Sequence, residues 1–171
     1  ELRAAYNEVL PRVTEFYTRL GSDERLYAKY KAIDPASLNP QQRKARENAM
    51  RDFVLGGAEL AETEKARFAQ IQERLAELTQ KFSENVMDAT DQWHHYTTRA
   101  EAAGVPDDVL QAASQLALAD AERDGATLQP DSVKFTLKIP SYLPVMQFAD
   151  SSALRGHLYR GYTTRASDQG V

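Results

Sequence analysis

The most constraining feature of the sequence is a long apolar repeat between Thr63 and Ala89. Large hydrophobic residues recur in it at spacings of three and four, in the order Phe68, Ile71, Leu75, Leu78, Phe82 and Val86. This spacing places them on one side of a single α-helix, nearly as in a heptad repeat. We therefore expect one helix over residues 61–90. At 1.5 Å per residue it is about 40 Å long, and other helices are needed to cover its apolar side.

The residues before this repeat predict shorter helices that could cover it. Leu2–Leu20 carries the same spacing of three and four, and Pro11 in its middle is expected to kink or interrupt the helix. Asp23 can cap a second helix, and Asn39-Pro40 supplies the cap and first-turn proline of a third. The sequence therefore predicts a series of helical hairpins over residues 1–57.

The hydrophobic periodicity changes in the second half of the chain. Gln92–Thr98 contains a Trp, a Tyr and a Thr pair, which favour a short strand, and Val133–Ile139 alternates apolar and polar residues as a half-buried strand does. An alanine-rich stretch between them predicts a helix. We expect short strands plus a helix over residues 91–149, followed by a helix over residues 150–166. The fold class is thus mainly α, a helical bundle with a small antiparallel β-sheet inserted in the second half.

Composition narrows the class of protein. The chain has 171 residues, enough for one domain with a substantial core. Its 21 basic and 25 acidic residues are spread along the chain and give a net charge of −4, so we expect no nucleic-acid partner. The apolar runs are far too short to cross a bilayer, so we expect no membrane partner and a cytoplasmic location. The absence of cysteine excludes disulfides and thiolate catalysis.

The two ends of the sequence suggest a part of a longer protein. The chain opens at Glu1 without a methionine, and the next residue already belongs to the first apolar repeat. It stops at Asp168–Val171, which does not resemble a natural terminus. We therefore expect a fragment of a larger protein.

No catalytic or metal-binding residue can be assigned from the sequence. A zinc peptidase places two histidines one helical turn apart with a glutamate between them, and no H-E-x-x-H occurs here. The histidines are His94, His95 and His157. The first two are adjacent, so on a strand they point to opposite faces. A small enzyme that uses these three histidines remains an alternative, and it would require bound zinc.

The densest group of chemically versatile side chains lies near the C-terminal end. Arginine and tyrosine can orient a peptide backbone or carboxylate through planar donor pairs and hydroxyl groups. We therefore mark four residues as possible substrate-channel positions: Tyr142, Arg160, Tyr162 and Arg165. In the alternative interpretation the arginines pair with acidic residues of the long helices and the tyrosines form the edge of the core.

Several stretches resemble the family of thimet-oligopeptidase-like zinc peptidases, in the same order along the chain. Near the C-terminal end they are Tyr142–Met146, Ala153–Arg155, Tyr159-Arg160 and Tyr162–Gly170. Upstream they are Leu2–Asn7, Asn48–Phe53, Leu75–Leu78 and Phe82–Thr90. The resemblance covers nearly the whole chain and thins between residues 100 and 125.

The resemblance implies a mostly helical zinc metalloendopeptidase, divided by a deep channel, that cuts short peptides and excludes folded proteins. In that family the H-E-x-x-H helix and a third glutamate ligand come from the later catalytic half, and none of those positions exists in this sequence. The chain is therefore expected to be the non-catalytic N-terminal part. It would form a channel wall, and its partners would be short peptide substrates, bound together with the missing catalytic domain. Zinc would belong to the parent enzyme and not to this part. The alternative is a freestanding helical protein-interaction module.

Overall fold

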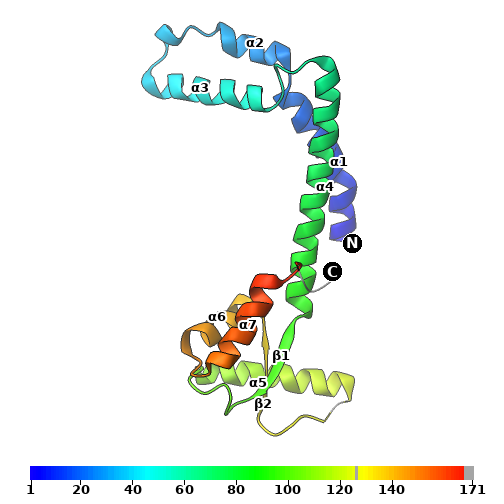
Figure 1. Ribbon diagram of the computed structural model, residues 1–171, viewed down its shortest axis with the longest axis vertical. Helices are drawn as coiled ribbons and strands as arrows, with labels where there is room; N and C mark the ends of the chain where they lie inside the picture. The colour runs from blue at the N-terminus through cyan, green and yellow to red at the C-terminus, as the bar shows by residue number, and fades with distance from the viewer. Residues whose placement is uncertain (126, 168–171) are drawn as a thin grey trace. The chain divides into compact units, whose positions relative to one another are not determined.

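The computed structural model describes residues 1–125 and 127–167, and its internal contacts divide the chain into two compact units (Figure 1). We call Glu1–Lys81 the N-terminal unit and Phe82–Val171 the C-terminal unit. The elements are, in order, α1 (Leu2–Gly21), α2 (Glu24–Ala32), the short 3-10 helix η1 (Pro35–Ser37), α3 (Pro40–Leu55), α4 (Glu62–Gln92), β1 (His94–Thr98), α5 (Asp107–Asp124), β2 (Ser132–Thr136), α6 (Ile139–Phe148) and α7 (Ser152–Thr164). The expected fold class, mainly α with a small antiparallel sheet in the second half, is confirmed. Among the described residues, no helix combines the length and apolar character that crossing a membrane requires.

Local capping chemistry fixes the helix starts of the N-terminal unit. The Asn39 side chain accepts a hydrogen bond from the Gln42 backbone N–H at 2.8 Å, and the Gln42 side chain accepts one from the Asn39 N–H at 3.0 Å. This reciprocal capping box satisfies two backbone donors that a helix start otherwise leaves unpaired. Asp23 likewise caps α2 by accepting from two backbone N–H groups. The starts expected at these two positions are confirmed.

Aromatic packing holds α2 against α3. The Phe53 ring lies with its centroid 5.7 Å from that of Tyr27 and 5.4 Å from that of Tyr30. The Tyr27 hydroxyl also donates to Glu59 at 2.5 Å, just beyond the end of α3. These contacts make the α2–α3 hairpin the best-packed part of the N-terminal unit, and Tyr27 is buried.

The interruption expected at Pro11 does not occur, because α1 continues through it from Leu2 to Gly21. A proline removes one backbone donor from the helical ladder. The helix has two or more turns on each side of this position, so the remaining hydrogen bonds maintain it.

The C-terminal unit is built around a two-stranded sheet covered by helices. β1 and β2 are antiparallel, with His94 opposite Thr136 and Thr98 opposite Ser132. β2 packs on α5 and α6. The most deeply buried large side chains are Val133, Phe135, Leu137, Val145 and Leu158. This unit therefore encloses a hydrophobic core of its own.

A polar cluster ties the sheet to α5. The Asp120 carboxylate accepts from the Tyr96 hydroxyl at 2.7 Å and forms an ion pair with Lys134. The Lys134 hydrogen bond, followed by that of Tyr96, lowers the pKa of Asp120 to about 2. The hydrogen bond to Asp120 in turn raises the pKa of Tyr96 to about 12. At neutral pH the carboxylate therefore stays charged and links β1, β2 and α5.

The second strand is shorter than the sequence pattern predicts. Val133–Ile139 was expected to be extended, but β2 ends at Thr136 and α6 begins at Ile139. The Thr136 backbone N–H donates to the Ser141 hydroxyl at 2.9 Å, which turns the chain out of the strand. Pro140 then lies in the first turn of α6, where its missing N–H has no helical partner to lose.

Two glycines of α7 allow a matched test of the C-terminal core. A Cβ at Gly161 would lie 2.6 Å from the Trp93 indole ring, whereas a Cβ at Gly156 meets no atom within 4 Å. We expect Gly161→Ala to lower the free energy of unfolding by about 1–3 kcal/mol through overpacking. Gly156→Ala should raise it by about 0.5–1 kcal/mol, because alanine favours the helix. Urea unfolding followed by circular dichroism measures both, and equal effects would contradict the Trp93–Gly161 packing.

Candidate functional site

Three of the four residues marked from the sequence form one stack in the C-terminal unit. The Tyr142 ring from α6 lies on the Tyr162 ring from α7, with centroids 4.4 Å apart and planes inclined by 17°. The guanidinium carbon of Arg165 lies 3.7 Å from the Tyr162 ring centroid, on a residue just past the end of α7. Arg160 is exposed on α7 and is not a member of the stack.

The stack has a buried end and a cationic end. Tyr142 is buried, and its burial, followed by the influence of Tyr162, raises its pKa. Arg165 Nη1 donates to the Tyr162 backbone carbonyl at 2.8 Å, whereas its buried Nε has no hydrogen-bond partner among the described residues. The guanidinium is planar, a shape that suits a carboxylate, and stacking on Tyr162 fixes its orientation. Tyr142 can therefore support the stack from the interior, while Arg165 holds the charge that a ligand would meet.

The three histidines do not converge. The rings of His95 and His157 lie with centroids 4.3 Å apart, and the Trp93 ring lies 5.6 Å from that of His157. His94 is exposed and packs its ring against Tyr96, so it leaves the strand on the other side from His95, as expected. Within residues 1–125 and 127–167, no group of three or more histidine or acidic side chains is placed to hold a metal ion.

A groove runs between α1 and α4 in the N-terminal unit and was not expected from the sequence. It encloses about 540 Å³ and is lined mostly by small and charged side chains, together with Phe68 and Gln70: Pro11, Arg12, Thr14, Glu15, Thr18, Arg19, Ser22, Glu62, Lys65, Ala66, Phe68, Ala69, Gln70 and Glu73. The small residues keep the two helices from filling the space between them. Small residues at helical spacing, such as Thr14 with Thr18, are the signal that could have revealed it.

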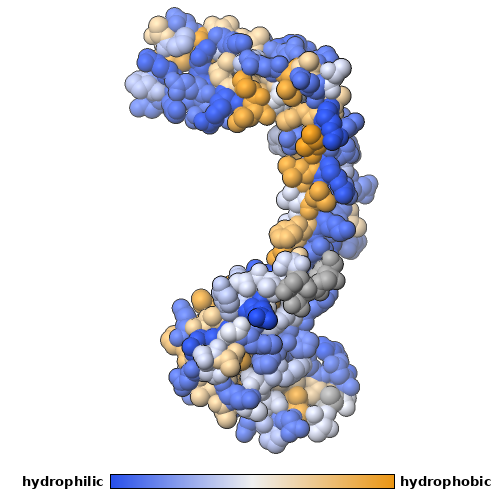
Figure 2. Space-filling model, viewed as in Figure 1, coloured by the Kyte–Doolittle hydropathy of each residue, from blue (hydrophilic) through white to orange (hydrophobic). Residues whose placement is uncertain are grey.

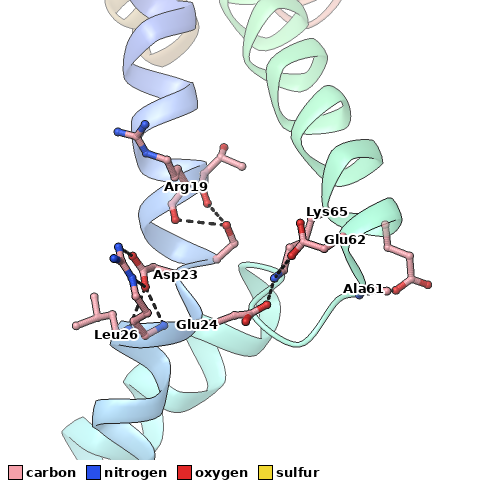
Figure 3. Close-up of polar contacts among 11 residues, drawn as sticks. Arg19, Asp23, Glu24, Leu26, Ala61, Glu62 and Lys65 are labelled. Atoms are coloured by element: carbon pink, nitrogen blue, oxygen red, sulfur yellow. Dashed lines mark hydrogen bonds and ion pairs between the residues drawn. The ribbon is translucent and has the colours of Figure 1, made fainter.

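An ion cluster closes one end of this groove. Lys65 reaches from α4 to Glu24 of α2 and lies 3.3 Å from Glu62 of its own helix (Figure 3). The hydrogen bond to Glu24 is the main reason that the pKa of Lys65 is raised. Lys65 is largely shielded from solvent, at 18% side-chain exposure, and is neutralised by these two carboxylates. It therefore ties the start of α4 to the start of α2, and its charge is already balanced by these carboxylates.

The other side of the α1–α4 pair carries two adjoining hollows of about 500 and 260 Å³, which we call the apolar groove. Both hollows include Thr14 and Gln72 in their linings. Their large apolar lining residues are Tyr6, Leu10, Val13, Tyr17, Leu55, Phe68 and Leu75. Figure 2 shows hydrophobic side chains gathered along this part of the N-terminal unit.

The half-buried histidine predicts a pH effect on stability. Burial, followed by the neighbouring His157, lowers the pKa of His95 below its ordinary 6.5. Below pH 6.5 the unfolded chain binds a proton that the folded chain does not, so the free energy of unfolding should fall as pH falls. The free energy of unfolding stops falling once the pH is below the pKa of His95 in the folded chain, because both states then bind the proton. We expect His95→Phe to weaken the dependence between about pH 7.5 and 5 and His94→Phe to leave it intact.

The measurement is urea unfolding at a series of pH values, followed by the fluorescence of Trp93, the single tryptophan. Because the Trp93 ring lies beside the rings of His95 and His157, its fluorescence reports on the unit in which the titration occurs. An unchanged pH dependence in His95→Phe would contradict the assignment to His95.

The chain is similar to proteins of one peptidase family along almost its whole length. Residues 1–65 match the model of the neurolysin/thimet oligopeptidase N-terminal domain. Oligopeptidase A of Salmonella typhimurium is 45% identical over 175 residues, which cover 99% of this chain and 25% of that protein. Oligopeptidase A of Haemophilus influenzae is 44% identical over a stretch that covers 99% of this chain and 24% of that protein. A probable cytosolic oligopeptidase A of Arabidopsis thaliana is 38% identical over a stretch that covers 98% of this chain and 24% of that protein.

These similarities identify the family and the part of it that the chain represents. The chain spans about a quarter of the length of these relatives. The similarities favour the interpretation that the chain is part of a peptidase over the alternative that it is a freestanding interaction module. The chain belongs to the oligopeptidase A family and corresponds to the N-terminal part of its members.

Proposed function

We propose that this chain is the non-catalytic N-terminal portion of a zinc-dependent metalloendopeptidase that degrades short peptides. The observation that carries the proposal is the 45% identity to an oligopeptidase A along 99% of the chain. Identity of this extent covers both units, and the name of that relative is that of a peptidase. We propose a cytoplasmic location for the parent enzyme, in line with the cytosolic name of one relative.

The chemistry of the reaction would belong to the remaining part of the parent enzyme. A zinc peptidase needs three protein ligands around the metal and an open position for water. The histidines of this chain do not fit such a site, since His95 packs on His157 and His94 faces away. Zinc would therefore be bound only by the missing catalytic domain.

The role that we propose for this portion is to form part of a channel wall. α4 alone has 31 residues, which corresponds to a length of about 46 Å. Rigid helices of this length beside an active site would admit an extended peptide and exclude a folded domain. The short peptide substrate would then contact this chain and the missing catalytic domain together.

We further propose that the tyrosine–arginine stack contacts the peptide. Arg165 and the exposed Arg160 supply cationic donors suited to a carboxylate, and Tyr162 orients Arg165 by stacking. Tyr142 supports Tyr162 from the interior.

Peptide hydrolysis tests the proposal in two forms of the protein. We expect this chain alone to be folded and to show no chelator-sensitive cleavage of a short fluorogenic peptide, because it lacks the zinc ligands. The full-length parent should cleave the peptide and leave a folded protein intact, and a parent lacking residues 1–171 should lose that preference.

Two outcomes would contradict us. One is chelator-sensitive cleavage by the isolated chain after contaminating peptidase is excluded. The other is a shortened parent that still cleaves and still prefers short peptides over a folded protein, which would show that this portion is not the filter.

A further inference from the structure

The apolar groove exposes large side chains that a self-contained protein would bury. Tyr17 is 64% exposed, Leu55 is 69% exposed and Leu75 is 55% exposed, although all three line the same pair of hollows. None of the described residues of α1 is buried, despite its long apolar stripe. Contiguous apolar surface of this kind marks an interaction site.

The two units differ sharply in how completely they bury their large hydrophobic side chains. The C-terminal unit buries Phe135, Leu137 and Leu158 almost completely. In the described part of the N-terminal unit, the buried hydrophobic residues are Tyr27 and Ala58, both outside α1 and α4. The packing of α1 beside α4 therefore leaves their stripes without a covering layer.

The geometry of the groove fits a helix. Tyr6 and Leu75 line one hollow, and Val13 and Phe68 line the next, so α1 and α4 run in opposite directions along the groove. Each helix carries hydrophobic residues at alternating spacings of three and four. Two such helices side by side offer rows of holes that accept the apolar stripe of a third helix, as in a helical bundle.

The lining also excludes recognition through charge. Asp52 is the one charged residue among those that line the two hollows, and the polar lining residues are otherwise uncharged. An acidic or basic peptide would find no complementary surface here, whereas an apolar helix would bury the exposed side chains.

We propose that the apolar groove is the docking site of an amphipathic helix from the remaining part of the parent polypeptide. The proposal rests on the family membership that also underlies the proposed function. About three quarters of the length of the relatives lies outside this chain. A helix on the same polypeptide reaches the groove at a high effective concentration, unlike a second copy or a separate protein. The occupied groove is then structural, and substrate would meet other faces of the unit.

Thiol labelling of the full-length parent tests the docking, because this chain has no cysteine of its own. Leu75→Cys places a thiol in the groove, and Glu77→Cys places one on the opposite side of α4 at a side chain of similar exposure, 64%. On α1, Val13→Cys and Glu8→Cys form a second matched pair. A maleimide and mass spectrometry of the labelled peptide give the rate at each position.

We expect the thiols of Leu75→Cys and Val13→Cys to react at least about tenfold more slowly than their controls in the parent, because labelling requires local opening. In the isolated chain all four should react at similar rates. Equal rates within each pair in the parent would overturn the proposal. Protection in the isolated chain that rises with its concentration would also overturn it, because a second copy would then be the occupant.

Peptide hydrolysis by the same preparations separates this proposal from the function proposed above. A parent that cleaves peptides but labels equally at Leu75→Cys and Glu77→Cys contradicts the docking alone. A parent with a protected groove and no peptidase activity contradicts the function alone.

Discussion

The hydrophobic stripe of α4 is the constraint on which the N-terminal unit depends. A helix of 31 residues keeps its form in water mainly through the packing of an apolar face. α1 lines grooves together with it, but large side chains of both helices, such as Tyr17 and Leu75, stay exposed. The α2–α3 hairpin is fixed by its own aromatic contacts and does not cover them. The unit is therefore an ordered framework with an incomplete core.

The C-terminal unit buries its apolar side chains in a core of its own. β2 directs Val133 and Phe135 into a core that α5, α6 and α7 close, and Trp93 fills the space that Gly161 leaves on α7. Because α6 and α7 are held by this core, the rings of Tyr142 and Tyr162 stack on each other, and the Arg165 guanidinium lies over the Tyr162 ring. The cationic end of the stack thus inherits its position from the packing beneath it.

The elements that the sequence predicted best are those set by local chemistry. Asn39 and Asp23 accept backbone hydrogen bonds within three residues, so their capping roles are visible without tertiary structure. The end of β2 was mispredicted because it depends on Ser141, whose hydroxyl competes for a strand donor. The stack was only partly predictable: Tyr162 and Arg165 are three residues apart in the sequence, but Tyr142 joins them through tertiary packing. The apolar groove depends on how two distant helices meet, which periodicity alone does not give.

The exposed groove has a consequence for biosynthesis. A ribosome releases the N-terminal part of a protein first, at about 5–20 residues per second. The relatives are about four times as long as this chain, so in a protein of that length the wait for the rest would be on the order of tens of seconds. During that interval Tyr17, Leu55 and Leu75 face the solvent with nothing yet made to cover them. Exposed apolar surface of this kind favours aggregation, so a later helix that docks in the groove would also remove this risk.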